Sequence, residues 1–319
     1  MYAQKKIALV IPAYNEERLI QPTLKEAPSL IDSIYVVDDC STDNMPAVVR
    51  DLAKQDSRIN LIQHTVNSGP GRAIINGYKK AFADGADIVV VVGGDYQMPY
   101  EQVSNLLDPI VLDQADYTKG NRFMVSEGLW EVVPASMPKL RLAGNMIITI
   151  LTKFASGYYK VADVVDGFTA ISKNAYQRIN WNEAWGGYGY PMDFLIRLNA
   201  KGLRVRDVPR RPIYIAGERQ SQIKGVSYAL KVSPMLLKGF FWRLWNKYVL
   251  WDFHPVFLFF MAGLLMLPLG LLFGVYLIWS QWAGYGVSGP RAVLCALLII
   301  SGLQFLLYAL LIDMEEGKS

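Results

Sequence analysis

Two long uncharged stretches near the end of the chain restrict its fold more than any other feature. Val256–Trp279 is 24 residues long and Ala292–Ile312 is 21, with Ser301 and Gln304 as the polar side chains of the second. About 20 apolar residues cross a bilayer as a helix, and buried core helices rarely run so long. Two buried helices of a soluble protein are the alternative. The lengths favour two membrane spans joined by a hairpin.

The distribution of basic residues predicts how these spans are oriented. Several basic side chains precede the first span: Lys224, Lys231, Lys238, Arg243 and Lys247. The link Ser280–Arg291 carries Arg291 alone. The positive-inside rule then places the main domain in the cytoplasm and the hairpin tip outside. We expect an integral protein of the cell (inner) membrane, or of an equivalent membrane, with the tail Asp313–Ser319 returning to the cytoplasm.

Composition excludes several other classes of protein. The net charge of +4 is modest, and no basic run with interleaved aromatic residues appears, which argues for attraction to a membrane surface and against nucleic-acid binding. Two cysteines, Cys40 and Cys295, indicate no disulfide framework and fit a reducing compartment. The apolar run Ile7–Ile11 is too short for a signal peptide and is followed by Pro12.

The first part of the chain alternates short β-branched runs with amphipathic segments. The runs predict buried strands at Lys6–Ile11, Ser33–Val37, Ile59–His64 and Ile88–Val92. Helices are expected between them, over Glu16–Glu26, Asn44–Gln55 and Gly71–Asp84. Apolar strands between helices are typical of a parallel sheet covered on both faces. The fold class is therefore α/β, with a mostly parallel sheet and ligands at the carboxyl ends of its strands.

The middle of the chain is more mixed and leads to three predicted regions. A helix over 100–114, a strand near 116–119, a loop over 127–139 and a helix over 140–156 are expected. Residues 230–251 form a basic amphipathic helix with tryptophans, which suits the lipid headgroup layer; packing on the domain is the alternative. We divide the chain into a catalytic domain at 1–228, an interfacial helix at 229–254 and a two-helix hairpin with a short tail at 255–319.

Polar clusters follow three of the predicted strands. They occupy 12–17, 38–43 and 93–97, and strand ends in one parallel sheet converge on one crevice. Each could alone be a helix cap or a turn. Asp95 is the strongest candidate for a metal ligand. A departing diphosphate develops negative charge, and a divalent cation neutralises it. Mg²⁺ uses one or two carboxylates and completes its shell with phosphate and water, and Gln97 offers a further oxygen.

These motifs together resemble a known family. PAYNEE, VVDDCSTD, NSGPGRAIINGYKKA and GGDYQMP are similar, in order and spacing, to the GT-A glycosyltransferases of family 2. Among its branches the chain most resembles the dolichyl-phosphate mannose synthase-like, polyprenyl-phosphate transferases. GNRF, DVVDGFTAIS, GYGYPMDFLIRL and RDVPRRPIYIAGERQSQIK extend the likeness over nearly the whole chain. The resemblance implies a Rossmann-like GT-A fold and an inverting transfer from a nucleotide sugar.

The resemblance also implies a donor site. Its residues would be Pro12, Tyr14, Glu16, Asp38, Asp39 and Asp95, with Asp39 near the base and Asp38 assisting. It implies Mg²⁺ or Mn²⁺ at Asp95 and Gln97. Gly93 departs from the family, since many relatives carry an Asp-x-Asp signature that begins there. Gly71 is interpreted as part of a helix start beside the donor pocket, because a lone glycine-rich turn is a weak phosphate signal.

A lipid phosphate acceptor needs positive charge more than a base, since the second pKa of a phosphate monoester is about 6. The candidates to bind it are Arg122, Arg141, Arg219 and Lys224. Arg122 and Arg219 are favoured because they resemble family positions, whereas Arg141 could be a solvated cation at a helix end. Arg210 and Arg211 are interpreted as surface charges. His64 and His254 lack ligand-spaced companions and are poor metal candidates. His64, at a strand end, is interpreted as structural, and His254 is expected at the water–membrane boundary.

Three further carboxylates are candidates on the acceptor side. Asp163 lies where relatives carry an aspartate before a Gly-aromatic turn and would orient acceptor or sugar, and Asp166 would do the same or initiate the turn before Gly167. Asp193 falls near the position that serves as base in relatives with hydroxyl acceptors. Asp193 should then be indispensable only with such an acceptor.

The sequence thus predicts an inverting, metal-dependent transferase that moves a hexose from a UDP- or GDP-sugar to polyprenyl or dolichyl phosphate on the cytoplasmic leaflet. One alternative is transfer to a hydroxyl of a glycolipid or polysaccharide, although two spans are few for a channel-forming polymerase. Another is a membrane-tethered sugar-nucleotide-binding protein with little activity, prompted by Gly93. Homo-oligomers are possible, because similar two-span relatives form them.

Overall fold

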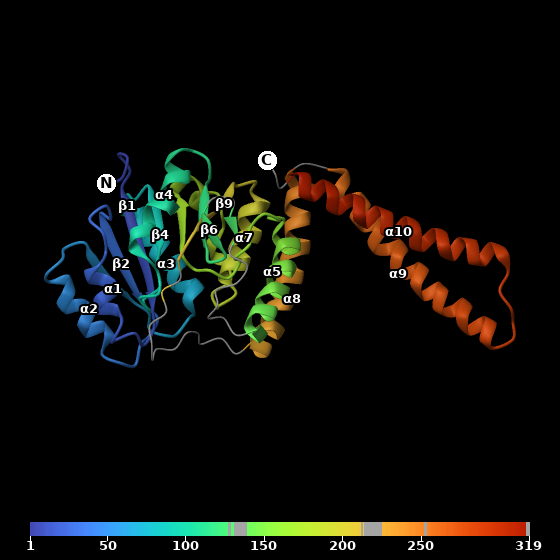
Figure 1. Ribbon diagram of the computed structural model, residues 1–319, viewed down its shortest axis with the longest axis horizontal. Coiled ribbons are helices and arrows are strands. Elements are labelled where there is room, and N and C mark those ends of the chain that lie inside the picture. The colour runs from blue at the N-terminus through green and yellow to red at the C-terminus, as the bar shows by residue number, and fades with distance from the viewer. Residues whose placement is uncertain (127–128, 131–138, 212, 214–224, 252–253, 317–319) are drawn as a thin grey trace. The chain divides into compact units, whose positions relative to one another are not determined.

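The computed structural model describes residues 1–126, 129–130, 139–211, 213, 225–251 and 254–316 (Figure 1). Its contacts divide the chain into two compact units, Met1–Phe240 and Phe241–Ser319.

A seven-stranded sheet forms the centre of the first unit within the described residues, in the order β3-β2-β1-β4-β8-β5-β9. Its strands are β1 (Ile7–Ala13), β2 (Ser33–Asp38), β3 (Ile59–Gln63), β4 (Ile88–Val91), β5 (Tyr117–Asn121), β8 (Thr169–Ser172) and β9 (Val205–Pro209). β8 runs antiparallel to β4 and β5, and the other neighbours are parallel. The predicted mostly parallel sheet is confirmed. The carboxyl ends of β1, β2 and β4 therefore lie at one edge.

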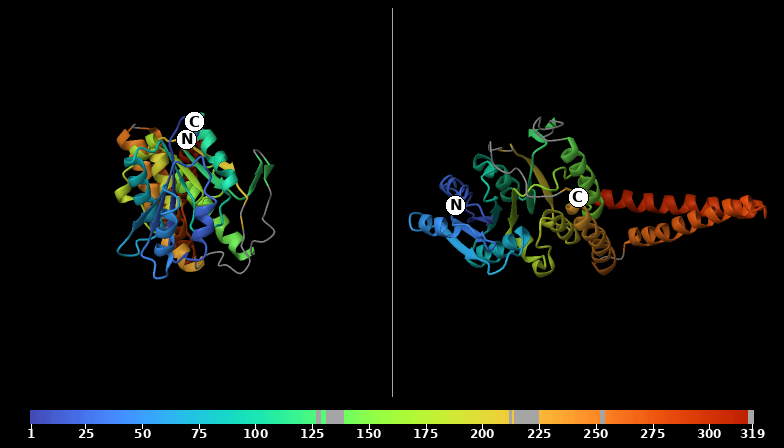
Figure 2. Two further views of the ribbon diagram at one scale, coloured as in Figure 1. Left: turned by 90° about the vertical axis from the view of Figure 1, so that its left-hand side faces the viewer. Right: turned by 90° about the horizontal axis from the view of Figure 1, so that it is seen from below.

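Helices cover both faces of this sheet (Figures 1 and 2). They are α1 (Ile20–Lys25), α2 (Met45–Ala53), α3 (Pro70–Ala83), α4 (Val103–Val111), α5 (Lys139–Ser156), α6 (Lys173–Gln177) and α7 (Tyr190–Ala200), with short 3₁₀ turns at Tyr100–Gln102 and Trp181–Glu183. A hairpin pairs β6 (Met124–Ser126) with β7 (Leu129–Trp130).

Alternation along β1 explains the two layers. Ile7, Leu9 and Ile11 belong to the core that contains the buried side chains of α1, α2 and α4. Val10 points to the opposite face, where a Cβ at Gly77 of α3 would lie 2.4 Å from its Cγ1. Each fully buried aliphatic side chain of this kind contributes about 1.5–3 kcal/mol of transfer free energy.

Most predicted elements lie within a few residues of their expected bounds, with three exceptions. The helix expected over 16–26 begins at Ile20, because the carbonyl of Glu16 accepts from the amides of Leu19 and Ile20 in a turn. In the loop expected over 127–139, Leu129–Trp130 form β7 and Lys139 begins α5, and the rest lies outside the described residues. The single helix expected over 230–251 is an α-helix that starts at Gly225 and gives way to a π-helical turn at Asn246.

The second unit contains the two apolar helices. α9 spans Pro255–Trp282 and α10 spans Gly289–Glu316, and in their most apolar windows 22% and 17% of the residues are buried. A core helix of a soluble protein would be mostly buried, so these helices are candidate membrane spans. They follow α8 (Gly225–Trp245) and a π-helical turn, η3 (Asn246–Trp251). The side chain of His254 caps α9 by accepting from the amide of Val256 at 3.3 Å.

Small residues allow α9 and α10 to lie side by side (Figure 1). A Cβ at Gly302 would lie 2.6 Å from the amide nitrogen of Leu267, and one at Gly263 would lie 2.7 Å from Leu306. Gly263 and Gly270 are buried in α9, and Cys295, Gly302 and Ala309 in α10. The spacing of seven residues is that of a left-handed helix pair, and close backbone approach is how membrane helices associate.

Candidate active site

Asp39, directly after β2, is held by three hydrogen bonds at the carboxyl edge of the sheet. Its carboxylate accepts from the amides of Ser68 at 2.8 Å and Gly69 at 2.7 Å. It also pairs with Nδ1 of His64 at 2.8 Å, and Nε2 of that ring lies 2.8 Å from the side-chain amide of Asn76. His64 was interpreted as structural, and the structure places its ring directly on Asp39. Asp39 is therefore fixed in orientation.

Asp38 stabilises the turn that carries Asp39. It is buried, and its two carboxylate oxygens accept from the Ser41 amide at 2.9 Å and the Gln63 side chain at 3.2 Å. Both bonds stay within the β2 turn and its neighbour β3. Asp38 thus shapes the turn that presents Asp39.

Tyr188 is a residue that the sequence reasoning passed over, although it lies in the quoted GYGYP motif. Burial raises the pKa of its phenol, and the charges of Glu16 and Asp39, with the phenol of Tyr14, raise it further. Glu16, Asp39 and Tyr14 therefore lie close enough to Tyr188 to act electrostatically on its phenol. Tyr188 is 46% exposed.

The start of α3 is fitted closely to the segment that carries Tyr188. Gly69 has a φ of +89°, and a Cβ there would lie 2.6 Å from the carbonyl oxygen of Gly186. A Cβ at Gly71 would lie 2.5 Å from the carbonyl oxygen of Trp185. These glycines permit backbone contact that any side chain would prevent.

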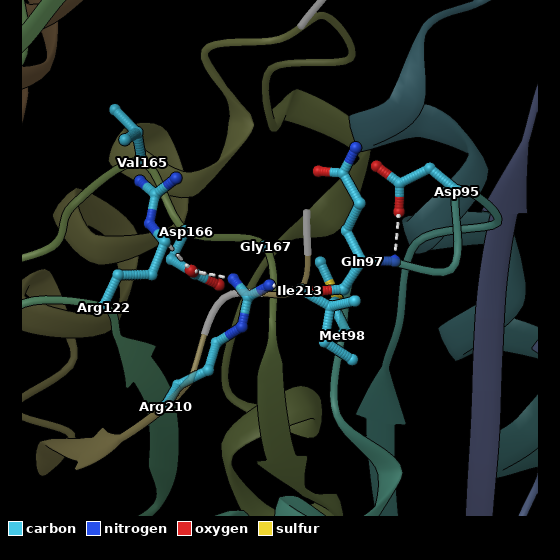
Figure 3. A pocket seen from close by; sticks show the side chains of 9 residues that line it. All are labelled: Asp95, Gln97, Met98, Arg122, Val165, Asp166, Gly167, Arg210 and Ile213. Atoms are coloured by element: carbon cyan, nitrogen blue, oxygen red, sulfur yellow. Dashed lines mark hydrogen bonds and ion pairs between the residues drawn. The ribbon is translucent and has the colours of Figure 1, made fainter. Parts of the chain in front are cut away.

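A cavity of about 110 Å³ lies at the end of β4 (Figure 3). It is lined by Asp95, Gln97, Met98, Arg122, Val165, Asp166, Gly167, Arg210 and Ile213. Pockets that hold a whole drug-sized ligand measure about 300–1,000 Å³. This cavity has room for part of a ligand, such as a phosphoryl group.

Asp95 is partly buried in this cavity. Burial raises the pKa of its carboxyl group, while the amide of Gln97, at 3.3 Å, and the charge of Arg210 lower it. A Cβ at Gly93 would lie 2.8 Å from Oδ1 of Asp95, so the carboxylate rests over the glycine. A side chain at position 93 would force Asp95 to move.

The described residues contain no cluster of three or more His, Cys, Asp or Glu able to hold a metal. Asp95 and the side-chain amide of Gln97 project to the same side of the cavity (Figure 3). One carboxylate and one amide oxygen fit a hard cation whose remaining ligands come from phosphate and water.

Arg122 is bound by two aspartates. It pairs with Asp163 through Nε at 2.7 Å and Nη2 at 2.9 Å, and its Nε lies 3.3 Å from Asp166. Asp163 and Asp166 are both buried. Three residues that the sequence suggested separately thus form one ionic group. The same group holds a fourth residue, Arg210, whose interpretation as a surface charge was wrong: it is 6% exposed and pairs with Asp166. Arg211, its neighbour, is exposed.

Asp193 does not join this cavity. Asp193 accepts from the Trp185 amide at 2.9 Å and from Nε of Arg197 at 2.7 Å, so it fixes the segment before α7. Arg141 lies in α5. Arg219 and Lys224 lie outside the described residues.

Comparison with known proteins adds three findings. Residues 8–179 match the sequence profile described as Glycosyl transferase family 2. The UDP-N-acetylglucosamine–dolichyl-phosphate N-acetylglucosaminyltransferase of Methanococcus voltae is 31% identical over 225 residues, which cover 66% of this chain and 87% of that protein. The undecaprenyl-phosphate mannosyltransferase of Micrococcus luteus is 26% identical over 207 residues, covering 64% and 82%.

A solved structure supports the fold. Glucosyl-3-phosphoglycerate synthase of Mycobacterium tuberculosis, in complex with Mg²⁺ and UDP, superposes with a TM-score of 0.53 at 17% identity, covering 76% of this chain and 80% of that one. At this identity the likeness concerns the fold alone.

Proposed function

The chain belongs to glycosyl transferase family 2 and is a glycosyltransferase, and from that membership we propose that it moves a hexose from a nucleoside-diphosphate sugar to polyprenyl or dolichyl phosphate. The observation that carries this proposal is the cavity in which Asp95 faces two arginines at the carboxyl edge of the sheet. The related enzymes of Methanococcus voltae and Micrococcus luteus are named for transfer to such lipid phosphates.

The donor occupies the edge formed by the ends of β1, β2 and β4 in this proposal. Asp39, oriented by Ser68, Gly69 and His64, offers a fixed acceptor to the N–H and O–H groups of a nucleoside. Tyr188 offers a flat face beside it. Pro12 belongs to the same edge, where its carbonyl accepts from the amide of Gly94 at 3.3 Å.

A divalent cation, Mg²⁺ or Mn²⁺, would be held by Asp95 and Gln97 together with the donor phosphates. When bound, it neutralises charge on the leaving diphosphate. The chain's own contribution is to orient that diphosphate with Asp95 on one side and the arginine pair on the other.

The position of Asp193 supports a phosphate acceptor. A hydroxyl acceptor needs a base within hydrogen-bond reach, and Asp193 does not line the cavity that contains Asp95, while its Oδ2 is bonded to Arg197 and Trp185. A lipid phosphate is anionic near neutral pH and needs orientation instead. The catalytic unit would lie on the cytoplasmic side, since basic residues precede the first span.

The test uses the full chain in lipid nanodiscs that contain polyprenyl phosphate, with a panel of labelled UDP- and GDP-sugars and with Mg²⁺, Mn²⁺ or chelator. We expect label in the lipid, and a loss of about 100-fold or more in kcat for Asp95→Asn, because it removes a charged group from the reacting centre. Glu101→Gln, an exposed change six residues away, is the matched control. Label that enters lipid only when a hydroxyl-bearing glycolipid is supplied would contradict the phosphate acceptor.

A further inference from the structure

Arg210 follows β9 and is fixed by three separate elements. Its amide donates to the carbonyl of Asn121 at 3.1 Å. Its guanidinium pairs with Asp166 through Nη1 and donates from Nη2 to the backbone carbonyl of Gln97 at 2.6 Å. A long side chain is thereby held in one orientation at the wall of the cavity (Figure 3).

The neighbouring chain leaves room for this side chain. A Cβ at Gly120 would lie 3.1 Å from Cδ of Arg210 and 3.1 Å from the ring of Phe168. The guanidinium carbon lies 5.8 Å from the centroid of the same ring. Gly120 on β5 and the ring of Phe168 before β8 therefore border the side chain of Arg210 where it extends to the cavity.

The hydrogen bonding of Arg210 is incomplete. A guanidinium carries five N–H donors, and Nε of Arg210 is buried with no acceptor among the described residues. Buried donors are ordinarily paired in folded proteins, so an unpaired one calls for a ligand or another explanation. The guanidinium is held in place but not saturated.

The position of Arg210 indicates which kind of ligand would complete its hydrogen bonding. Its positive charge acts on Asp95, which lines the same cavity. An Asp-x-Asp signature would place a second carboxylate at position 93. This chain has Gly93 there, so Asp95 is the one carboxylate of that three-residue motif. Arginine is suited to phosphoryl oxygens, because its planar fork matches their geometry.

We propose that Arg210 binds a phosphoryl oxygen in this cavity and so fixes the phosphate group at which the sugar is transferred. This inference rests on the proposed function for the source of that phosphate, which is either the donor diphosphate or the lipid acceptor. Arg210 differs in this from Arg122: Nε and Nη2 of Arg122 both donate to Asp163, whereas Nε of Arg210 has no acceptor among the described residues.

The experiment compares Arg210→Gln and Arg210→Lys with the full-length protein. We expect Arg210→Gln to fold. Asp166 would still pair with Arg122 and accept from the Phe168 amide, and the Gln97 carbonyl would still accept from the Ile213 amide. Arg206→Gln is the matched control, since Arg206 lies on β9, the strand that Arg210 follows, and donates to Gln114 instead. Thermal unfolding of each variant checks that the fold is intact.

Two measurements distinguish the donor diphosphate from the lipid acceptor as the source of the phosphate. Titration calorimetry with inorganic pyrophosphate and Mg²⁺ reports the diphosphate site, and the KM for polyprenyl phosphate in nanodiscs reports the acceptor site. We expect Arg210→Gln to weaken one of these about 10- to 100-fold, the range for a hydrogen bond to a charged group. Arg210→Lys should fall between Arg210→Gln and the wild type, because it keeps the charge and loses the fork.

The outcomes are distinct from those of the function test. A wild-type protein that transfers no sugar but binds pyrophosphate in an Arg210-dependent way would overturn the proposed function and leave the phosphate site standing. Active enzyme whose two affinities are the same in Arg210→Gln, Arg206→Gln and the wild type would overturn the inference alone. Arg210 would then serve only to link β9 to Asp166.

Discussion

Asp207 lies in β9, and its two carboxylate oxygens differ in their bonding. Oδ2 accepts from the side chain of Asn121 at 2.9 Å and the amide of Ala162 at 2.8 Å, while Oδ1 is buried with no partner in the part of the chain that the structure describes. Burial raises the pKa of Asp207 to about 6, against the opposing effects of the Ala162 amide and Lys119. The ionised form is therefore disfavoured in the folded protein.

We predict that Asp207 makes stability fall as pH rises from about 4 to 6. Over that range the unfolded chain has lost the proton that the folded chain keeps, so raising the pH favours unfolding. A shift from 3.8 to about 6 corresponds to about 3 kcal/mol. Asp207→Asn should remove this dependence, because an amide does not titrate and its nitrogen would occupy the position of Oδ1. Thermal midpoints between pH 4 and 8 measure it, and an equal change in the exposed control Asp51→Asn would refute the assignment.

At the residue scale, the sequence predicted which polar residues gather but not how they pair. Asp95, Arg122 and Asp166 share a cavity because strand ends meet at one edge of the sheet. Arg210 was missed because an Arg-Arg pair after a strand gives no sign of which side chain turns inward. Gly120, which makes the room, is 90 residues earlier in the chain.

At the element scale, a buried ion pair connects the segment before α9 to the end of α10. Arg243 binds Asp313 through Nη1 at 2.7 Å and Nη2 at 2.9 Å, and the hydroxyl of Tyr248 donates to the same carboxylate at 2.6 Å. Arg243 and Asp313 are 0% and 3% exposed. The pair closes the hairpin at the end where α9 begins and α10 ends.

We predict that Asp313→Asn destabilises the hairpin by about 3–5 kcal/mol, because it removes the carboxylate charge that faces the buried guanidinium of Arg243. The double change Arg243→Met with Asp313→Leu should recover most of this loss, since apolar side chains of similar size avoid the charge altogether. Denaturant unfolding in detergent measures both. Glu315→Gln, on the exposed side of α10, is the control. A loss no greater than that of the control would show that the ion pair contributes nothing.

The elements themselves were largely predictable, because apolar β-branched runs and long uncharged stretches have few alternative structures. The direction of β8 was not. Thr169–Ser172 is too short to indicate whether it runs with or against its neighbours. Its antiparallel pairing with β4 and β5 depends on contacts between segments that lie far apart in the sequence.

At the scale of the whole molecule, we predict that the first unit and the α9–α10 link lie on opposite sides of the membrane. Lys54→Cys and Ser288→Cys, each in a background with Cys40→Ser and Cys295→Ala, report the two sides, because both positions are exposed. An impermeant maleimide should label position 288 in right-side-out vesicles and position 54 in inside-out vesicles. Labelling of both positions from one side would refute a membrane-crossing hairpin.

The presence of two regions of different character was readable from the sequence, since charge is scarce after Asp252. Their boundary was less readable. Contacts divide the chain at Phe240, within α8, because a continuous helix carries no local sign of where its packing partners change.

The ion pair between Arg243 and Asp313 also has a consequence for biosynthesis. The two residues are 70 positions apart, and synthesis proceeds at about 5–20 residues per second. Arg243 is therefore synthesised roughly 4–14 seconds before Asp313. During that interval the nascent chain holds Arg243 beside the first apolar helix without the carboxylate of Asp313. The last turn of α10 completes the hairpin, and a ribosome that stalls before it leaves a product that lacks this ion pair.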